Sequence, residues 1–466
     1  MYLNLDNKEK HLIAAVDSCG NQITYGELCN FAKIFREIVE PRTIVFCLCE
    51  NTVGALVGYT SFIENRVVPL LLPFNIESSL LKELMEIYKP RYFWYPSHFK
   101  VALAGDIIAE YFDYKLAVTE NQPYPIYEEL SLLLTTSGST GSPKLVRHSY
   151  KNIEANARNV ASVFNITTGD RAMADLPFQY TMGLNVICSH LYGGATVLLT
   201  PLSLMSKGYW DFFKAQRATT FTGVPYSYEV LRKLRFTSSE WPDLKILTQG
   251  GGKLPESTYI EFSKYAMSTG KAFIPTFGQT ECTARMAYLP PELAIEKCTS
   301  IGGPIPEGEL FLVDEQGNEI TNQEAEGEMG YRGPNVTMGY AICREDLTKG
   351  DEWHGEILTG DIARRDRDGC YYIIGRRNRF LKLYGLRVSL DQCERLIQSE
   401  FNIECACTGT DRKMIIYITN EEYINAIPDF LTQKTNIYKS SFEARLIGEI
   451  PRNDTGKILY AQLDSV

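Results

Sequence analysis

Short apolar runs alternate with longer amphipathic segments between residues 43 and 277. The run TIVFCLC precedes the helical pattern VGALVGYTSFIENR, and the run VVPLLL precedes SSLLKELMEIYKP. The same rhythm returns around ATVLLT, ATTFTGVP, LKILTQGGG and KAFIPTFG. Apolar runs of strand length that alternate with helices are typical of βαβ units, whose helices cover the faces of a sheet. The pattern therefore predicts a layered α/β fold.

After about residue 300 the alternation gives way to short strands separated by glycines, such as GELFLVDEQGNEI and EILTGDIARRDRDGCYYIIG. This pattern indicates hairpins. Further on, LDQCERLIQSE is typical of an amphipathic helix and MIIYIT of a strand. We predict a large N-terminal domain over residues 1–377, with a β-rich subdomain at about 300–377, and a small, mobile α+β C-terminal domain over 378–466. A chain of 466 residues exceeds what one hydrophobic core usually supports, in agreement with two domains.

The composition argues against several classes of function. The chain has 47 Lys and Arg against 57 Asp and Glu, so it has no general electrostatic attraction to nucleic acid or to an anionic membrane. Its apolar runs are too short to span a bilayer, and charges stand where a signal peptide has its apolar region. The 12 cysteines form no CxxC pair, which predicts reduced, buried thiols and no structural zinc. We expect a cytoplasmic protein with no nucleic-acid partner and no stable membrane insertion.

The run TTSGSTGSPK, from Thr135 to Lys144, directly follows the apolar residues Leu132–Leu134. Glycines let backbone N–H groups approach an anion, hydroxyls donate hydrogen bonds and the lysine adds a positive charge, so the run suits a polyphosphate. It is not a Walker A loop, because a leucine follows Lys144 where that motif has Ser or Thr. A flexible linker is the alternative, but linkers are not usually placed against a buried strand and closed with Pro-Lys.

Five later segments have ordinary structural explanations when each is taken alone. The pair Thr-Glu in FGQTE (277–281) suits a helix cap, and the aspartate of LTGD (358–361) suits a turn. The basic run GRRNRFLKLYGLRV from residue 375 suits a solvated face, and the lysine of PRNDTGK (451–457) suits a frayed end. GGGKLP (250–255) is a glycine-rich loop.

Taken together, these segments point to one family. TTSGSTGSPK resembles the phosphate-loop signature of the adenylate-forming superfamily, which includes acyl-CoA synthetases, peptide-synthetase adenylation domains and luciferases. The five later segments match the family's other motifs, in the family's order, across nearly the whole chain. The pattern is most similar to the acyl-CoA synthetase branch. The resemblance implies an acid-thiol ligase that uses ATP and Mg²⁺ and releases AMP and pyrophosphate.

The resemblance also implies a role for each motif residue. Phe277 would pack beside the adenine, Asp361 would accept a hydrogen bond from the ribose, and Lys144 would hold the loop or the pyrophosphate. The full set expected to bind ATP is Thr136, Ser137, Gly138, Ser139, Thr140, Gly141, Lys144, Gly250, Gly251, Gly252, Phe277, Gly278, Gln279, Asp361, Arg376 and Arg387. Catalysis is expected from Lys457, Thr280 and Glu281, of which Glu281 is also the expected Mg²⁺ ligand.

The implied chemistry has two half-reactions. The substrate carboxylate attacks the α-phosphorus of ATP and pyrophosphate departs, so positive charge must neutralise two anions. The small domain then rotates, and a thiol attacks the acyl adenylate. The expected hinge is Asn378, where the family commonly has Asp. Asn tolerates unusual backbone angles, so the hinge role is retained.

The segment LPFQYTMGLNVICSHLYGGA (176–195) aligns with the family's substrate-pocket motif. Enzymes that adenylate α-amino acids usually have an Asp at the position of Thr181, and a hydroxyl cannot replace that ion pair. Gly183 agrees with the acyl-CoA synthetase form, whereas Tyr180 stands where that form has a histidine. We therefore expect a small carboxylic acid, acyl or hydroxyacyl, as the substrate.

The acceptor and one rival function stay open at this point. Coenzyme A and the phosphopantetheine of an acyl carrier protein end in the same thiol. The basic run Arg376, Arg377, Arg379 and Lys382 suits either the 3′-phosphate of CoA or an acidic carrier protein. The main alternative is therefore a ligase that loads an acyl or amino-acyl group onto a carrier protein. A second alternative is a catalytically silent homologue that binds nucleotides or acyl adenylates, which the intact Lys457, Glu281, Asp361 and Arg376 argue against.

Overall fold

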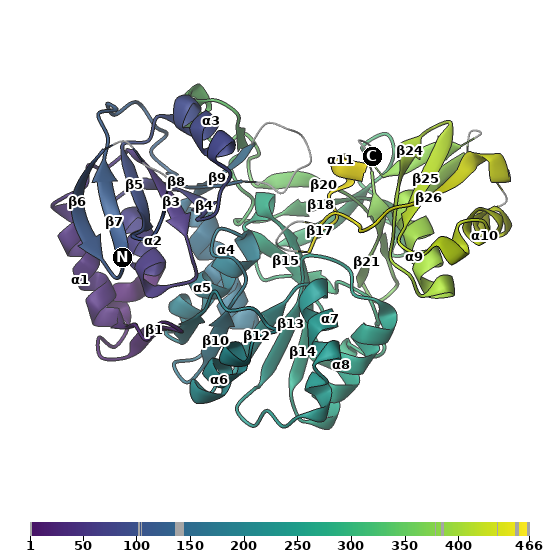
Figure 1. The fold of residues 1–466 in the computed structure, drawn as a ribbon, viewed down its shortest axis with the longest axis horizontal. Helices are drawn as coiled ribbons and strands as arrows, with labels where there is room; N and C mark the ends of the chain where they lie inside the picture. Colours follow the sequence, from purple (N-terminus) through teal and green to yellow (C-terminus); the bar gives the residue numbers. More distant parts are fainter. Residues whose placement is uncertain are drawn as a thin grey trace.

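The computed structural model describes residues 2–100, 103, 105–135, 144–377, 379–383, 386–435, 437–452 and 456–463, and only the backbone of residues 382, 386, 387 and 461. Two large sheets and a smaller antiparallel sheet form the body of the molecule, and a further α+β part follows at the C-terminal end (Figure 1). The layered α/β fold predicted from the alternating pattern is confirmed.

The first large sheet has eight strands in the order β19-β9-β8-β4-β3-β5-β7-β6. Its centre is parallel, because β4 pairs with both β3 and β8 in that sense. The six residues of β3 are all buried, as expected for a parallel strand that is covered on both faces. The bounds are β3 Ile44–Cys49, β4 Val68–Pro73, β5 Tyr92–Pro96, β6 Asp106–Tyr111, β7 Tyr114–Val118, β8 Leu130–Thr135, β9 Leu145–Ser149, β19 Tyr340–Ala341, α1 Tyr25–Arg36, α2 Val53–Glu64 and α3 Ser78–Tyr88.

The second large sheet has nine strands in the order β16-β15-β14-β13-β12-β10-β11-β1-β2. The bounds are β1 Ile13–Asp17, β2 Gln22–Thr24, β10 Arg171–Ala174, β11 Thr196–Leu199, β12 Thr220–Gly223, β13 Ile246–Gln249, β14 Ala272–Gln279, β15 Ala284–Tyr288, β16 Gly303–Pro304, α4 Tyr150–Val163, α5 Thr181–Gly193, α6 Lys207–Ala215, α7 Pro225–Lys233 and α8 Glu256–Ser268. Helices α2 and α4 contact strands of both large sheets. The main core is therefore shared, with Val45 and Leu134 of one sheet in the same cluster as Ala174 and Val197 of the other.

The glycine-punctuated region folds as predicted into a four-stranded antiparallel sheet, in the order β17-β18-β20-β21. The C-terminal part has a core of its own, which includes Leu383, Ile397 and Ile416. The bounds are β17 Glu309–Val313, β18 Ala325–Arg332, β20 Glu356–Arg365, β21 Tyr371–Arg376, β22 Phe380–Leu383, β23 Leu386–Ser389, α9 Leu390–Phe401, β24 Cys405–Thr410, β25 Lys413–Ile418, α10 Ala426–Thr435, β26 Phe442–Leu446 and α11 Tyr460–Leu463. The domain boundary predicted at Asn378 falls on a residue outside the described part of the chain.

The twelve cysteines are all free, and most are buried, as expected for small apolar residues. Cys19 departs from that expectation because it is exposed, and Cys29, Cys298 and Cys343 are half-buried. Within the described ranges, every helix is too short or too polar to cross a membrane.

Candidate active site

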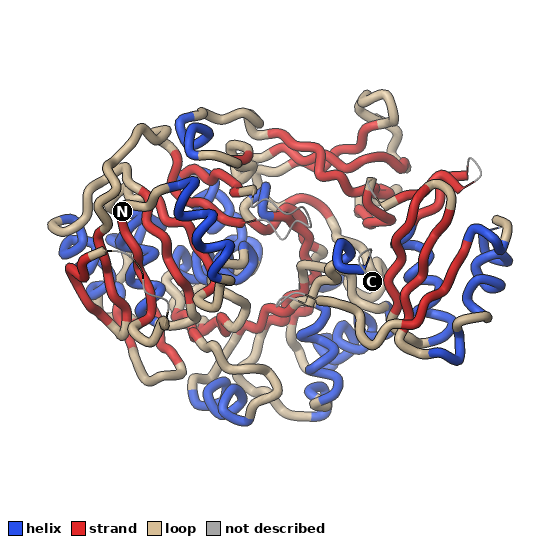
Figure 2. The backbone as a smooth tube through the Cα atoms, turned by 45° about the horizontal axis from the view of Figure 1, so that its top comes forward, coloured by secondary structure: helices blue, strands red, loops and turns tan. Residues whose placement is uncertain are grey.

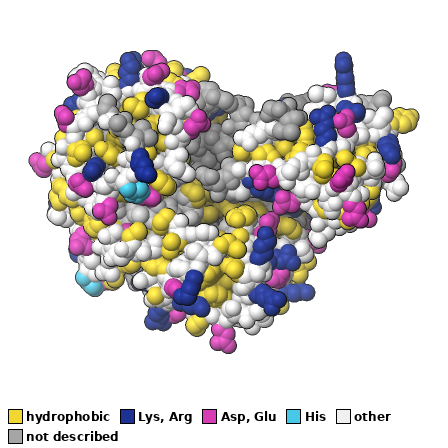
Figure 3. Space-filling model, viewed as in Figure 1, with side chains coloured by type: hydrophobic (Ala, Val, Ile, Leu, Met, Phe, Trp, Pro, Cys, Tyr) yellow, Lys and Arg dark blue, Asp and Glu magenta, His cyan; other side chains and the backbone are white. Residues whose placement is uncertain are grey.

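The end of the chain turns back toward the body of the molecule. Figure 2 shows α11 lying between the C-terminal sheet and the rest of the fold, and Figure 3 shows the surface hollowed where the two parts meet. Gly456 sits at this contact with a φ of +78°. A Cβ there would lie 2.8 Å from the Cβ of Tyr226 in α7. Glycine thus permits both the left-handed backbone and the close approach that brings the next residue, Lys457, to the body.

Lys457 lines a pocket together with residues of three other predicted motifs. The lining residues are Tyr180, Thr181, Met182, Gly251, Thr276, Phe277, Gly278, Gln279, Thr280, Ala284, Arg285 and Lys457. The substrate-pocket segment, the glycine-rich loop, the FGQTE segment and the terminal lysine therefore meet in one place. Residues more than 270 positions apart, such as Tyr180 and Lys457, face the same space because the C-terminal part docks there.

The Lys457 ammonium is held among aromatic and charged groups. Its Nζ lies 5.6 Å from the centroid of the Tyr180 ring. Burial lowers the pKa of Lys457, and the nearby Arg376 lowers it further, whereas Glu281 and Asp361 act in the opposite direction. Lys457 therefore lies within electrostatic range of Arg376, Glu281 and Asp361, three charged residues that the resemblance assigned to the same site.

Asp361 and Arg376 form an ion pair across neighbouring strands. The Nε–H of Arg376 donates to Oδ1 of Asp361 at 3.1 Å, from β21 to β20. The second oxygen of Asp361, Oδ2, is buried and accepts no hydrogen bond from any described residue. Burial raises the pKa of Asp361, and the charge of Arg376 opposes that rise. A buried carboxylate oxygen without a donor is costly unless a ligand supplies one, so this oxygen suits a hydroxyl such as that of ribose.

Two threonines join the substrate-pocket segment to the FGQTE segment. The hydroxyl of Thr181, at the start of α5, donates to Oγ1 of Thr280 at 2.9 Å. Two glycines allow this arrangement. A Cβ on Gly183 would lie 2.4 Å from the carbonyl oxygen of Pro177, and a Cβ on Gly278 would lie 1.4 Å from that of Ala284. Both separations are too short for any side chain, so each strand or helix reaches its place only with glycine there.

Glu281 takes part in a chain of contacts that the sequence did not suggest. The hydroxyl of Tyr340, in β19, donates to Oε1 of Glu281 at 2.8 Å. The Nζ of Lys144 lies 5.3 Å from the centroid of the Tyr340 ring. Among the described residues no group of three or more His, Cys, Asp or Glu forms a metal site. A single carboxylate still fits a magnesium ion that arrives on nucleotide phosphates, because Mg²⁺ keeps several waters and needs only one or two carboxylates.

The other predicted ATP-binding residues fall into two groups. Gly250 and Gly252 lie beside the pocket, where a Cβ on Gly250 would meet Thr276 and Met182 and one on Gly252 would meet Pro225. The loop residues Thr136, Ser137, Gly138, Ser139, Thr140 and Gly141 lie outside the described residues, as do Asn378 and the side chain of Arg387. The residues that flank the loop, Thr135 and Leu145, pair across β8 and β9.

The basic run is not a free patch in this arrangement. Arg377 donates to Glu328 at 2.7 Å, and Arg379 donates to Glu394 at 2.6 Å while its guanidinium lies 3.7 Å from the Tyr460 ring centroid. With the Arg376 ion pair, each described arginine of the run has a carboxylate partner within the chain. An acceptor that used these arginines would compete with those carboxylates.

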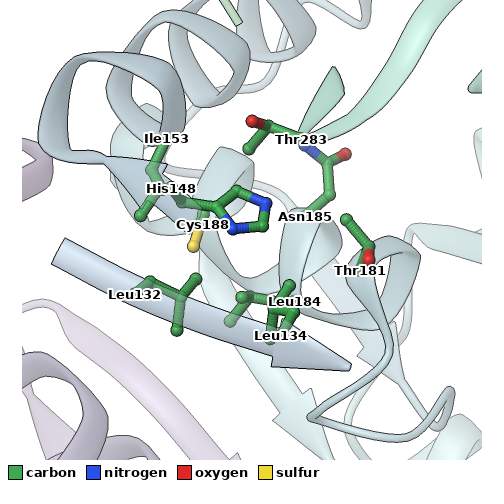
Figure 4. Close-up of a pocket in the computed structure, with 9 residues that line it drawn as sticks. All are labelled: Leu132, Leu134, His148, Ile153, Thr181, Leu184, Asn185, Cys188 and Thr283. Carbon is green, nitrogen blue, oxygen red and sulfur yellow. The ribbon is translucent and has the colours of Figure 1, made fainter. Parts of the chain in front are cut away.

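A second, mainly apolar cavity adjoins the site. Figure 4 shows His148 in the middle of its lining, which comprises Leu132, Leu134, His148, Ile153, Thr181, Leu184, Asn185, Cys188 and Thr283. Thr181 lines both cavities. Burial lowers the pKa of His148 to about 4, so the imidazole is neutral at physiological pH. The space behind Thr181 is therefore uncharged.

Sequence reasoning missed two residues of the site, Tyr340 and Arg285. Tyr340 carries no local signal, since it lies 59 residues beyond its partner Glu281. Arg285 does carry one. It is a single charged residue in the strand ARMAY, whose other positions are uncharged, and a charge inside a buried strand is unusual enough to mark a functional position.

Comparison with known proteins places the chain in one enzyme family. The sequence profile of the AMP-binding enzyme family matches residues 88–341, and the chain belongs to that family. It is 27% identical over 354 residues to a 3-hydroxybenzoate–CoA ligase of Aromatoleum sp. (strain CIB), a match that covers 71% of this chain and 65% of that protein. It is 30% identical over 264 residues to an oxalate–CoA ligase of Arabidopsis thaliana, covering 56% of this chain and 50% of the relative. The matches thus span about two thirds and one half of these relatives.

Among solved structures, the chain is similar to the O-succinylbenzoate coenzyme A synthetase (MenE) from Bacillus subtilis in complex with AMP. The TM-score is 0.79 at 21% sequence identity, and the superposition covers 97% of this chain and 95% of that one. At this level of identity the likeness supports the fold.

Proposed function

We propose that the chain is an acid-thiol ligase that activates a small carboxylic acid with ATP and transfers the acyl group to coenzyme A. The observation that carries this proposal is the position of Lys457, which lies in one pocket with Thr280 and Tyr180 although it comes from the far end of the chain. The Asp361 carboxylate, with one buried oxygen that has no donor among the described residues, supports a nucleotide in the same site. The CoA-ligase activities of the two relatives agree with the proposal.

In the first half-reaction the acid and the α-phosphate of ATP are both anions, so the site must supply positive charge where they meet. Lys457 supplies a cation there, and the Thr280 hydroxyl, which accepts from Thr181, is left with its own proton to donate to a phosphate oxygen. Mg²⁺ held by Glu281 would neutralise the phosphates further. Asp361 holds the ribose so that the α-phosphate faces the acid. The hydrogen bond from Tyr340 holds the Glu281 carboxylate in place, and the Lys144 ammonium lies over the ring of Tyr340.

For the second half-reaction we propose that the C-terminal part rotates about Asn378 and removes Lys457 from the pocket. The ion pairs on either side of this residue support the hinge. Arg376 and Arg377 pair with Asp361 and Glu328 of the four-stranded sheet, whereas Arg379 pairs with Glu394 of α9. The arginines up to residue 377 are therefore paired with the N-terminal part, and Arg379 is paired with the C-terminal part. This agrees with domains over 1–377 and 378–466.

A proline at the hinge tests this rotation. In Asn378→Pro the fixed φ is expected to slow thioester formation by about tenfold or more, while acid-dependent ATP–pyrophosphate exchange stays within about threefold of wild type. Asn378→Ala is the matched control, because alanine leaves φ unrestricted. Equal effects of the proline on both half-reactions would argue against a hinge at this position.

The charge of Lys457 predicts a pH dependence. The ammonium must be protonated to stabilise the anions, and its pKa is lowered from the ordinary value of 10.5. Its charge is therefore lost as pH rises through that lowered pKa, so the rate of exchange is expected to fall at a pH below 10.5. A pH profile of kcat/KM checks this. In Lys457→Arg the fall of kcat/KM at alkaline pH is expected to move to higher pH. If it stays at the same pH, the group that titrates is not Lys457.

The complete reaction is tested by mass detection of the thioester. Purified protein, ATP and an acid that supports exchange are incubated in parallel with CoA and with a holo acyl carrier protein. We expect acyl-CoA. A thioester on the carrier protein alone would assign the chain to carrier-protein loading, and the absence of any thioester from an acid that is adenylated would contradict the ligase proposal.

A further inference from the structure

Arg285 is a buried cation that faces the proposed acyl pocket. It lies in β15, opposite Gly278 of β14, and its side chain is 3% exposed. One terminal nitrogen, Nη1, donates to Oδ1 of Asn185, and the other, Nη2, donates to Oγ1 of Thr248 at 3.2 Å. The Nε–H is buried and has no acceptor within the described part of the chain. A guanidinium has five N–H donors, so most of its hydrogen-bonding capacity is unused.

The charge of Arg285 is also uncompensated. Within the described ranges no Asp or Glu oxygen lies within the 4.0 Å ion-pair distance of its guanidinium nitrogens. Burial lowers the pKa of Arg285 only to about 10, so the side chain stays charged at neutral pH. A buried cation with no anionic partner is strongly destabilising, and proteins rarely keep one without a ligand.

Arg147, the other fully buried arginine among the described residues, shows how this fold satisfies such a group. Its side chain donates to Glu352 at 2.5 Å and to the carbonyl oxygens of Met338, Tyr340 and Lys349 at 2.6 to 3.1 Å. The charge of Arg147 is thus neutralised by Glu352 within the chain, and we assign this residue a structural role. Among the described residues Arg285 has only two neutral acceptors and the Phe164 ring, 5.0 Å away.

The neighbours of Arg285 hold it in place without neutralising it. Asn185 donates to Oδ1 of Asn156, and Nδ2 of Asn156 donates to the backbone carbonyl oxygen of Arg285 at 2.7 Å. This closed ring of hydrogen bonds fixes the strand and the guanidinium relative to α4 and α5. A fixed cation loses little entropy when it binds an anion.

Tyr180 lies close to both cations of the pocket. Lys457 lies 5.6 Å from the centroid of its ring. The charge of Arg285 acts on the phenol of the same residue, lowering a pKa that burial raises to about 12. The pocket therefore has positive charge from two residues, Lys457 near the end of the chain and Arg285 in β15.

We propose that the Arg285 guanidinium binds a second anionic group on the acid, so that the substrate class is a bifunctional acid with a carboxylate at one end and another acidic group at the other. This inference rests on the proposed ligase function and adds the substrate class to it. The rival assignments are that Arg285 binds the reacting carboxylate itself, or that it only fastens α5 to β13. Neither predicts a preference for a second negative charge.

The wild-type enzyme tests the proposal with matched substrates. Straight-chain and aromatic dicarboxylic acids of increasing length are compared with their monoamides, which keep the shape and lack the second charge. ATP–pyrophosphate exchange is expected to show kcat/KM about 10²-fold higher for the fitting diacid than for its monoamide, since the monoamide leaves the buried charge unpaired. Equal values for diacid and monoamide at every length would overturn the proposal while leaving the ligase function intact.

Two variants locate the preference at Arg285. Arg285→Met is expected to abolish the diacid preference through KM, with kcat for the monoamide retained, and Arg285→Lys is expected to restore part of it. The melting temperature of Arg285→Met without ligand is expected to be unchanged or higher, because an uncompensated charge has been removed. A lower melting temperature with equal losses for diacid and monoamide would assign Arg285 a purely structural role.

The two proposals fail in different ways. If no acid supports exchange, the ligase function is wrong, and titration calorimetry with the diacids alone decides the role of Arg285. Binding to the wild type that disappears in Arg285→Met would support the anion site. Equal binding to both proteins, or none to either, would overturn it.

Discussion

Replacement of Lys457 by alanine is expected to slow acid-dependent ATP–pyrophosphate exchange by about 10²- to 10³-fold, the usual effect of removing one group that stabilises transition-state charge. The lysine lies in the pocket beside Tyr180, and its pKa responds to Glu281, Asp361 and Arg376. Its charge is therefore placed where the acid and the α-phosphate would meet. Thioester formation from a supplied acyl adenylate is expected to continue in the variant, because the proposed rotation removes Lys457 before that step.

The matched control is Lys413→Ala. Lys413 lies in the same C-terminal part, where it pairs with Glu443 at 2.8 Å on an exposed surface. Such pairs contribute little to stability, about 0–1 kcal/mol, so exchange is expected to stay near the wild-type rate. Exchange that survives in Lys457→Ala would remove the lysine from the first half-reaction, and equal losses in both half-reactions would indicate misfolding.

The change Asp361→Asn is expected to raise the KM for ATP by about 10- to 100-fold with a smaller effect on kcat. A hydrogen bond to a charged acceptor contributes about 1.5–3 kcal/mol, and the amide keeps the shape of the side chain without the charge. The ribose lies away from the reacting bond. Loss of the hydrogen bond to it therefore weakens the binding of the ground state and of the transition state alike. Nucleotide titrations of the variant, followed by calorimetry, measure this effect directly.

Asp368→Asn serves as the control on the same hairpin. Asp368 lies in the turn between β20 and β21, is largely exposed and pairs with Lys297. Its replacement is expected to leave the KM for ATP unchanged. If Asp361→Asn raises the KM for the acid but not for ATP, the carboxylate does not hold the nucleotide.

The sequence predicted the structure best where the cause of a structural feature lies in residues close together along the chain. The fully apolar run IVFCLC predicted a strand buried on both faces, and β3 is such a strand. The glycines at 183 and 278 lay inside motifs, and the structure supplies their cause, because any side chain there would overlap a backbone oxygen. The motifs also assigned Thr181 to the substrate pocket and Thr280 to catalysis, although their hydrogen bond could be seen only in three dimensions.

The sequence was least informative where the cause is a partner far along the chain. The basic run predicted a surface available to an acceptor, but Glu328 and Glu394 neutralise two of its arginines, and no local pattern reveals that pairing. Tyr340 reaches Glu281 only because β19 pairs with β9 at the edge of the first sheet. The difference between Arg147 and Arg285 is of the same kind. Both stand in buried strands, and only the fold shows which of them has an anionic partner.

The most direct test of the central claim is the exchange of labelled pyrophosphate into ATP in the presence of a broad panel of carboxylic acids. We expect exchange that depends strictly on an added acid, that requires Mg²⁺ and that falls by about 10² or more in Lys457→Ala. Exchange with no acid in the panel, by a folded protein that binds ATP, would contradict the account and leave a nucleotide-binding homologue without adenylation activity.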